Sequence, residues 1–158
     1  LRERTDLTVY LQGEETLAQL IQRFREERDS CLVGTMSLWQ GVDVAGEACR
    51  LVVIDKIPFP RPDDPVSRAR SMDVERRGGN GFVSVSLTHA ALMMAQGVGR
   101  LLRSTNDRGV VAILDPRLVT KRYGSFIMRS LPAMWPTTDP QIVRGALRRL
   151  AQGSDHEG

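Results

Sequence analysis

The chain has 158 residues, of which 41% are hydrophobic and 26% charged, a composition typical of one globular domain with a sizeable core. No apolar run reaches the roughly 18 residues of a membrane helix, and the first residues lack the apolar stretch of a signal peptide, so we expect a cytoplasmic protein without a membrane partner. The net charge is +3, and only two of the 22 basic residues are lysines. Arginine suits bidentate contacts with phosphate, so the excess of arginine over lysine is compatible with a nucleotide or nucleic-acid ligand. A GC-rich coding sequence would produce the same excess.

The two cysteines carry little functional information. Cys31 and Cys49 have no neighbouring Cys or His, and their spacing is not that of a metal site. We expect them to be buried free thiols of a cytosolic protein. No metal ligand is predicted in this chain.

The first half of the chain predicts strands around one helix. The run LTVYLQG (7–13) is β-prone and ends in glycine. Residues 14–29 begin with acids and place apolar side chains at helical spacing, which predicts an amphipathic helix. The runs 30–35 and 49–57 are continuously apolar, as in strands that are buried on both faces.

A long insert separates the second apolar run from a long helix. The insert, residues 58–81, opens with PFPRPDDP, which cannot be helical throughout. Its continuation predicts a polar helix that ends at the pair of glycines 78 and 79. Residues 86–103 predict one long helix.

The last part of the chain predicts one more strand and two helices. The strand is the apolar run 109–116, and a short helix follows within 119–132. The final helix spans 139–152, with Asp139 as its N-cap and Pro140 at its first position. Residues 153–158 are expected to form a disordered tail.

Apolar strands that alternate with helices predict an α/β domain over residues 1–152, with a mainly parallel sheet flanked by helices. In such sheets ligands bind at the carboxyl ends of the strands. Three strand exits qualify here, at 34–35, 55–56 and 115–116. At the third exit, Asp115 and Arg117 have two open interpretations: a strand-end ion pair, or a carboxylate that orients other arginines.

The helix 86–103 carries an unusual polar face. At about 100° per residue, Gln96, Arg100 and Arg103 fall within roughly 60° of one another. Gly97 and Gly99 each cost about 1 kcal/mol relative to alanine inside a helix. Close approach of a backbone or ligand would explain them, while a solvated face with paired arginines remains the alternative. The opposite side, expected to face the sheet, carries Ala91, Met94, Ala95, Val98, Leu101 and Leu102.

These residues carry a family resemblance. QGVGRLLR (96–103) resembles the Q-x-x-G-R-x-x-R motif VI of superfamily 2 helicases. Upstream, GTMSLWQGVDVAGEACRLVVIDKIPFPRPDDP (34–65) is similar to motif V of their DinG/XPD-like branch, and the residues after motif VI match the same branch. The resemblance runs from about residue 7 to residue 132, and the two motifs together are specific.

The resemblance implies the second of two RecA-like motor lobes, here incomplete, in an ATP-dependent DNA helicase. In such motors ATP binds between the lobes, and the first lobe holds Mg²⁺. Arg103 would be the arginine finger on the γ-phosphate, Arg100 its partner, and Gln96 would position the attacking water or hold the arginines.

The family also implies nucleotide-binding and DNA-binding residues. Asp43 resembles the motif V acid that contacts the ribose or orients motif VI. Nucleotide binding is implied as well for Gly41 and Gly99, and DNA-backbone contact is implied for Gly34, Thr35 and Ser37. The expected partners are single-stranded DNA and the N-terminal lobe of the same polypeptide.

The sequence departs from the family pattern in several places. Gln40 stands where motif V usually has an acid, which puts that carboxylate's role in doubt. No phosphate loop of the form G-x-x-x-x-G-K-[S/T] and no D-E-x-H occurs in the sequence, so we expect the C-terminal part of a motor that is inactive alone. Two cysteines cannot supply the four thiolates of the relatives' iron–sulfur cluster, so we expect none in this chain.

A rival hypothesis is that the chain is not part of a motor. A free-standing α/β nucleic-acid-binding or interaction module could keep the lobe fold. A motor needs Arg100 and Arg103 free to face an open cleft, whereas such a module would tolerate both in internal salt bridges. The basic stretch of Arg61, Arg68, Arg70, Arg76 and Arg77 has two interpretations as well, a DNA-phosphate track or a solvated face.

Overall fold

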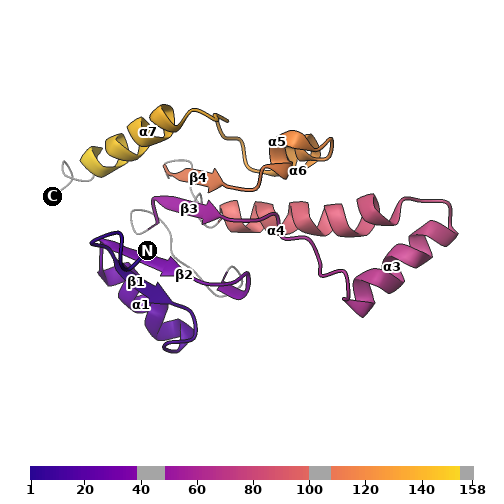
Figure 1. The fold of residues 1–158 in the computed structure, drawn as a ribbon, viewed down its shortest axis with the longest axis horizontal. Helices are drawn as coiled ribbons and strands as arrows, with labels where there is room; N and C mark the ends of the chain where they lie inside the picture. Colours follow the sequence, from indigo (N-terminus) through magenta and orange to yellow (C-terminus); the bar gives the residue numbers. More distant parts are fainter. Residues whose placement is uncertain (39–48, 100–107, 154–158) are drawn as a thin grey trace. The chain divides into compact units, whose positions relative to one another are not determined.

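The computed structural model describes residues 1–38, 49–99 and 108–153 (Figure 1). The described strands pair as two two-stranded parallel sheets, β1 with β2 and β3 with β4. The predicted α/β class is therefore confirmed. The described residues divide into two compact units: unit 1 comprises residues 1–38, 49–52, 108–110 and 139–153, and unit 2 comprises residues 53–99 and 111–138.

Unit 1 contains a β–α–β crossover, formed by β1 (Thr8–Leu11), α1 (Leu17–Glu26) and β2 (Ser30–Val33). The strands pair in register from Thr8 opposite Ser30 to Leu11 opposite Val33. Leu20 of α1 is 1% exposed, and burying a leucine stabilises the fold by about 1.5–3 kcal/mol. The crossover brings the carboxyl ends of both strands to one edge.

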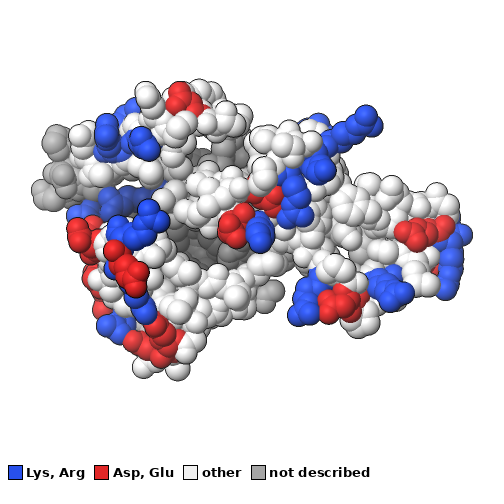
Figure 2. All heavy atoms as spheres, in the orientation of Figure 1, with Lys and Arg blue, Asp and Glu red and all other residues white. Residues whose placement is uncertain are grey.

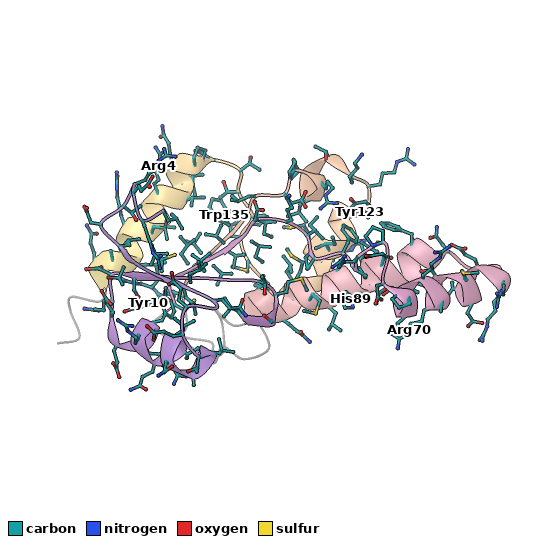
Figure 3. The ribbon with its side chains drawn as sticks, turned by 60° about the horizontal axis from the view of Figure 1, so that its bottom comes forward. Arg4, Tyr10, Arg70, His89, Tyr123 and Trp135 are labelled. Carbon is teal, nitrogen blue, oxygen red and sulfur yellow. The ribbon has the colours of Figure 1, made fainter. Side chains whose placement is uncertain are left out.

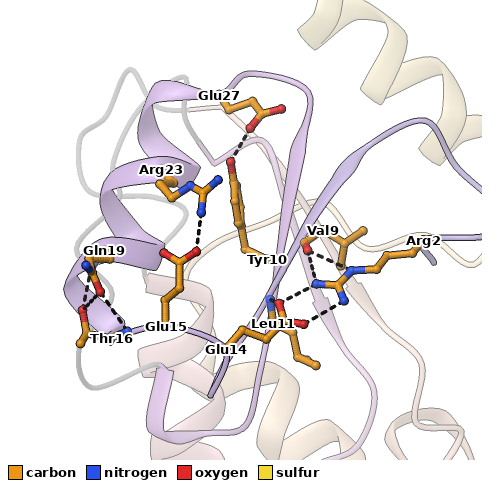
Figure 4. A network of polar contacts seen from close by, with 10 residues as sticks. All are labelled: Arg2, Val9, Tyr10, Leu11, Glu14, Glu15, Thr16, Gln19, Arg23 and Glu27. Atoms are coloured by element: carbon orange, nitrogen blue, oxygen red, sulfur yellow. Dashed lines mark hydrogen bonds and ion pairs between the residues drawn. The ribbon is translucent and has the colours of Figure 1, made fainter.

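Helix α1 begins three residues later than the sequence predicts. Thr16 is its N-cap: the Thr16 hydroxyl accepts a hydrogen bond from the Gln19 backbone N–H, and the Gln19 side chain accepts one from the Thr16 N–H (Figure 4). This capping box satisfies N–H groups at the helix start. Glu14 lies before the helix and forms an ion pair with Arg2.

A polar network ties α1 to the first strand (Figure 4). The hydroxyls of Thr8 and Tyr10 both donate to the carboxylate of Glu27, which follows α1. These hydrogen bonds hold the pKa of Glu27 below its usual value, because they favour its charged form. Arg23 lies over the Tyr10 ring at 5.1 Å and forms an ion pair with Glu15.

Strands β3 (Leu51–Ile54) and β4 (Val110–Ile113) form the other pair. The prediction that the apolar runs would be buried on both faces is wrong for β3. Leu51 and Val53 are 43% and 55% exposed, whereas Ile54 is 3% exposed. Side chains alternate between the two faces of a strand, so Leu51 and Val53 share the more exposed face of β3.

The predicted polar helix of the insert is α3 (Pro65–Arg76). Asp64 is its N-cap, since its carboxylate accepts a hydrogen bond of 2.8 Å from the Ser67 N–H. After the C-cap, Gly78 has φ +81°, a left-handed conformation that glycine adopts without strain. The helix therefore ends where the sequence predicts.

The long helix begins four residues earlier than predicted. A π-helical turn, η2 (Phe82–Leu87), leads into α4 (Thr88–Gly99). The side chain of Asn80 explains the early start, because its oxygen accepts a hydrogen bond from the Val83 N–H at 3.0 Å.

Helix α4 supplies much of the core of unit 2. Ala90, Met94 and Val98 are fully buried, and α4 packs against α6 (Gly124–Ser130). Within the described residues, the stretch Phe82–Gly99 is long and apolar enough to cross a membrane by length and composition alone. A core helix has the same composition.

Two short helices stand where one was predicted, α5 (Arg117–Thr120) and α6. Gly124 lies so close to the Leu118 carbonyl oxygen that a Cβ there would overlap it. Next to this turn, Tyr123 (Figure 3) packs against the rings of Phe59 and Phe82 at centroid distances of 5.6 Å.

The last helix, α7 (Pro140–Gly153), begins as the sequence predicts. The Asp139 carboxylate accepts a hydrogen bond of 2.8 Å from the Gln141 N–H. Pro140 occupies the first helical position, where the missing N–H has no helical partner to lose.

Candidate nucleic-acid interface

The exits of β1 and β2 lie side by side at one edge of their sheet. The last paired residues are Leu11 and Val33, and the Gln12 N–H continues the ladder with a 2.9 Å hydrogen bond to the Val33 carbonyl. The loop after β2 is thereby held next to Gln12. This is the strand-exit position at which the family resemblance implies DNA contacts by Gly34, Thr35 and Ser37.

Gln12, Thr35 and Ser37 form a hydrogen-bonded group that we call the hydroxyl cluster. The Gln12 Oε1 atom accepts from the Thr35 N–H at 2.8 Å and lies 3.1 Å from the Thr35 Oγ1. The Gln12 Nε2 donates to the Ser37 Oγ at 2.7 Å, and the two hydroxyl oxygens are 2.9 Å apart. Gln12 is half-buried, while Thr35 and Ser37 are exposed.

Gly34 makes this arrangement possible. A Cβ atom at this position would lie 2.6 Å from the Gln12 Oε1 and closer still to a methyl group of Leu38. Leu38 is 7% exposed, so its side chain has little room to move. The glycine therefore lets the Gln12 amide reach the loop backbone.

The exits of β3 and β4 carry a different group, which we call the carboxylate clamp. The buried Asp115 carboxylate accepts hydrogen bonds from the backbone N–H groups of Ile57, at 2.9 Å, and Arg117, at 3.0 Å. The Arg117 guanidinium donates to the same carboxylate through Nε and Nη2. Of the two interpretations of Asp115, the strand-end ion pair with Arg117 is the one that these contacts support.

The clamp is electrostatically fixed. Hydrogen bonds from Arg117 and from backbone N–H groups hold the pKa of Asp115 far below its usual 3.8, so the group stays ionised at neutral pH. Arg117 also lies over the Phe59 ring at 5.3 Å. Both the carboxylate and the guanidinium are thus engaged within the fold.

The described part of the helix predicted over residues 86–103 presents the predicted core side. Ala91, Met94 and Val98 are buried, as the sequence predicts for the core side, and Gln96 is exposed. An added Cβ at Gly99 would meet no atom of the described residues within 4 Å. Arg100 and Arg103 lie outside the described residues, as do Gly41 and Asp43 in the segment 39–48.

The basic stretch of the insert is interleaved with acids. Arg61 forms an ion pair with Asp63, and Arg77 with Asp73. On the face drawn in Figure 2, acidic side chains accompany the basic ones over α3. These contacts favour the solvated face over a continuous phosphate track for the stretch.

Metal ligands and thiols give no further site in the part of the chain that the structure describes. Across residues 1–38, 49–99 and 108–153, no three His, Cys, Asp or Glu side chains are grouped to hold an ion. Cys31 and Cys49 are free and half-buried, rather than buried as predicted.

Gln12 is the member of the site that the sequence did not reveal. It lies outside the motifs and 23 residues before Thr35. A polar amide at the end of an apolar β-prone run was the available signal. Only the parallel pairing of β1 with β2 shows that Gln12 lies next to Gly34 and therefore belongs to the site.

Comparisons with known proteins identify the family of the chain. Residues 1–134 match the family model described as the helicase C-terminal domain. The chain is 55% identical over 152 residues to the ATP-dependent helicase DinG of Mycobacterium tuberculosis, covering 96% of this chain and 23% of that protein. It is 46% identical over 150 residues to the ATP-dependent DNA helicase YoaA of Escherichia coli, covering 95% of this chain and 23% of that protein.

A third relative is the 3'-5' exonuclease DinG of Bacillus subtilis, which is 40% identical over 114 residues, 72% of this chain and 12% of that protein. The chain thus spans about a quarter or less of these relatives. The matched region includes both strand exits and all of α4. The chain belongs to the helicase C-terminal domain family of the DinG type, whose RecA-like fold accounts for its parallel strand pairs and flanking helices.

Proposed function

We propose that the chain is the second motor lobe of an ATP-dependent DNA helicase, and that it supplies DNA-backbone contacts and an arginine finger for translocation on single-stranded DNA. The observation that carries this proposal is the hydroxyl cluster. Thr35 and Ser37 expose two hydroxyls at the carboxyl end of a parallel strand, where such folds bind ligands. The family membership supports the same conclusion.

The cluster suits phosphate rather than bases. Ser and Thr hydroxyls are common donors to phosphate oxygens, and such contacts fix the position of the strand without reading its sequence. A motor that moves along DNA needs contacts of this kind. Gly34 contributes by keeping the loop close to β1, and Thr35 and Ser37 contribute the donors.

We assign the ATP side of the lobe to the exposed face of α4. Gln96 is exposed, and no atom of the described residues would lie within 4 Å of a Cβ at Gly99, which is compatible with close approach of a phosphate or of the N-terminal lobe. Arg100 and Arg103 lie outside the described residues, and the sequence spacing alone predicts them on the same helical face as Gln96. In this assignment, Arg103 stabilises the charge that develops on the transferred phosphoryl group, Arg100 supports it, and Gln96 orients the attacking water.

The remaining nucleotide contacts come from motif V, with Asp43 on the ribose and Gly41 beside it. As the family resemblance implies, Mg²⁺ would be held by the N-terminal lobe. We place the protein in the cytoplasm, where its DNA substrate lies, and expect the isolated chain to hydrolyse no ATP.

ATP hydrolysis, with and without single-stranded DNA, tests the proposal. The measurement compares the chain alone with the natural protein that contains it and its upstream region, here called the whole protein. Arg103→Ala in the whole protein should lower turnover by about 10³-fold or more while nucleotide still binds. Arg148→Ala, an exposed arginine of α7, is the matched control and should leave turnover unchanged.

Two results would contradict the assignment. The first is full turnover by the whole protein without Arg103, and the second is no hydrolysis by the whole protein under any condition. Either result would leave the non-enzymatic α/β nucleic-acid-binding module as the better description of the chain.

A further inference from the structure

The hydrogen bonds of the hydroxyl cluster fix the orientation of the Gln12 amide. A backbone N–H can only donate, so the amide atom 2.8 Å from the Thr35 N must be the oxygen Oε1. The amide nitrogen Nε2 then faces the Ser37 Oγ at 2.7 Å and donates to it. The assignment follows from the network itself, which is the proper basis for orienting an amide.

This orientation determines what the Ser37 hydroxyl can do. Ser37 Oγ accepts from Nε2, and its own single hydrogen remains available to another acceptor. The Thr35 hydroxyl can direct its hydrogen to Gln12 Oε1 at 3.1 Å, and its oxygen then accepts from Ser37 at 2.9 Å. The Ser37 hydrogen can therefore be donated either to the Thr35 oxygen within the chain or to an anionic oxygen of a ligand outside it.

We propose that Gln12 is a positioning residue for phosphate binding, which holds Ser37 as the hydrogen-bond donor to a phosphodiester oxygen of single-stranded DNA. This inference rests on the proposed function. Gln12 acts through Ser37 and Thr35 rather than by touching DNA. Donation from the amide polarises the Ser37 hydroxyl and strengthens the hydrogen bond that it makes outward, because hydrogen bonds in a chain reinforce one another.

The alternative role for Gln12 is purely structural, as a tie between the end of β1 and the loop after β2. The two roles differ in their dependence on Ser37. A structural tie would change stability and affect DNA binding whether or not the Ser37 hydroxyl is present. A positioning role disappears once that hydroxyl is removed.

A double-mutant cycle in the whole protein separates the two roles. The single variants Gln12→Ala and Ser37→Ala and their combination are compared for single-stranded DNA affinity, for ATP affinity without DNA, and for thermal stability. We expect Ser37→Ala to weaken DNA binding about tenfold and Gln12→Ala about fivefold. The double variant should be weakened about tenfold, rather than the roughly fiftyfold of independent effects.

A second substitution keeps the side-chain volume. In Gln12→Glu the carboxylate still accepts from the Thr35 N–H but cannot donate, so it draws the Ser37 hydrogen inward and places a negative charge near the phosphate. We expect DNA binding to weaken more than in Gln12→Ala. The matched control is Gln19→Ala, which removes another glutamine that bonds a threonine hydroxyl, on α1 at Thr16, and should leave DNA affinity unchanged.

The outcomes distinguish this inference from the proposal beneath it. If the whole protein binds no single-stranded DNA, both the proposed function and the role of Gln12 are overturned. Binding that falls in Ser37→Ala but not in Gln12→Ala or Gln12→Glu overturns the inference alone, as does a double variant whose effects multiply. ATP affinity that falls in step with DNA affinity also assigns Gln12 a structural role.

Discussion

The two pairs of strand exits in this chain hold their following loops with different kinds of side chain. At each, a side chain must hold the loop that follows a short parallel strand. The hydroxyl cluster does so with neutral groups, two of which are exposed. The carboxylate clamp does so with a buried carboxylate, 5% exposed, whose partners include two backbone N–H groups and a guanidinium.

The difference indicates which exit is available to a ligand. Hydroxyls can redirect their hydrogens at little cost, so the cluster can exchange an internal acceptor for an external one. An ionised carboxylate that is buried among donors can release none of them without a large penalty. The clamp therefore stabilises the fold, and the cluster is the exit suited to binding.

The largest effect on stability should come from breaking the clamp. Asp115→Ala leaves the Ile57 N–H and the Arg117 side chain without their acceptor, and we expect the free energy of unfolding to fall by about 3 kcal/mol. Urea denaturation measures the change. Asp63→Ala is the control, because its ion pair with Arg61 is largely exposed, and its effect should stay below about 1 kcal/mol. Equal losses in the two variants would contradict the assigned role.

Acid should remove the same contribution without a mutation. The pKa of Asp115 in the folded chain lies below its usual 3.8, so the stabilisation is complete above that value and is lost as the pH falls below it. The stability difference between wild type and Asp115→Ala should therefore shrink as the pH is lowered from 5 to about 2. Denaturation curves across this range test it, and a difference that stays constant would rule it out.

A smaller effect is expected at the hydroxyl cluster. In Gly34→Ala the new methyl group would meet the Gln12 amide and Leu38, and we expect the free energy of unfolding to fall by about 1–2 kcal/mol. DNA affinity should fall as well, because the displaced amide no longer holds Ser37. Thermal denaturation and DNA titration of the whole protein measure both. Wild-type affinity in this variant would show that the cluster's geometry does not matter for binding.

The smallest effect on the fold is expected at Gly99, where an added Cβ meets no atom. Gly99→Ala should change stability by less than about 1 kcal/mol, and upward, because alanine favours a helix. ATP turnover by the whole protein should nevertheless fall if a phosphate or the other lobe approaches this position. Unchanged ATP turnover in Gly99→Ala would contradict a role for Gly99 in the nucleotide site.

The sequence predicted the elements of the fold better than their boundaries. Apolar runs located all four described strands, and Asp139 with Pro140 located the start of α7. The start of α1 was missed because Thr16 and Gln19 form a capping box, and the start of the long helix was missed because the Asn80 side chain caps it. In both cases a side chain forms a hydrogen bond with a backbone N–H at the start of the helix, and hydrophobic periodicity carries no information about such bonds.

Only the residues of the site that lie within the family motifs could be predicted from the sequence. The family motif pointed to Thr35 and Ser37, and the structure adds Gln12 through strand pairing 23 residues away. For Asp115, the sequence left two interpretations open because an acid two residues before an arginine serves either. The Ile57 N–H, 58 residues distant in the chain, supplied the missing information.

The most direct test of the central claim, that the exit of β2 contacts the DNA backbone, is photocrosslinking. Met36 lies between Thr35 and Ser37 and is 36% exposed, so a photoreactive side chain can replace it without removing either hydroxyl. Leu7, before the amino end of β1 and 42% exposed, is the matched position. The account predicts that single-stranded DNA crosslinks to the whole protein at position 36 and not at position 7. Crosslinking at neither position, or equally at both, would contradict it.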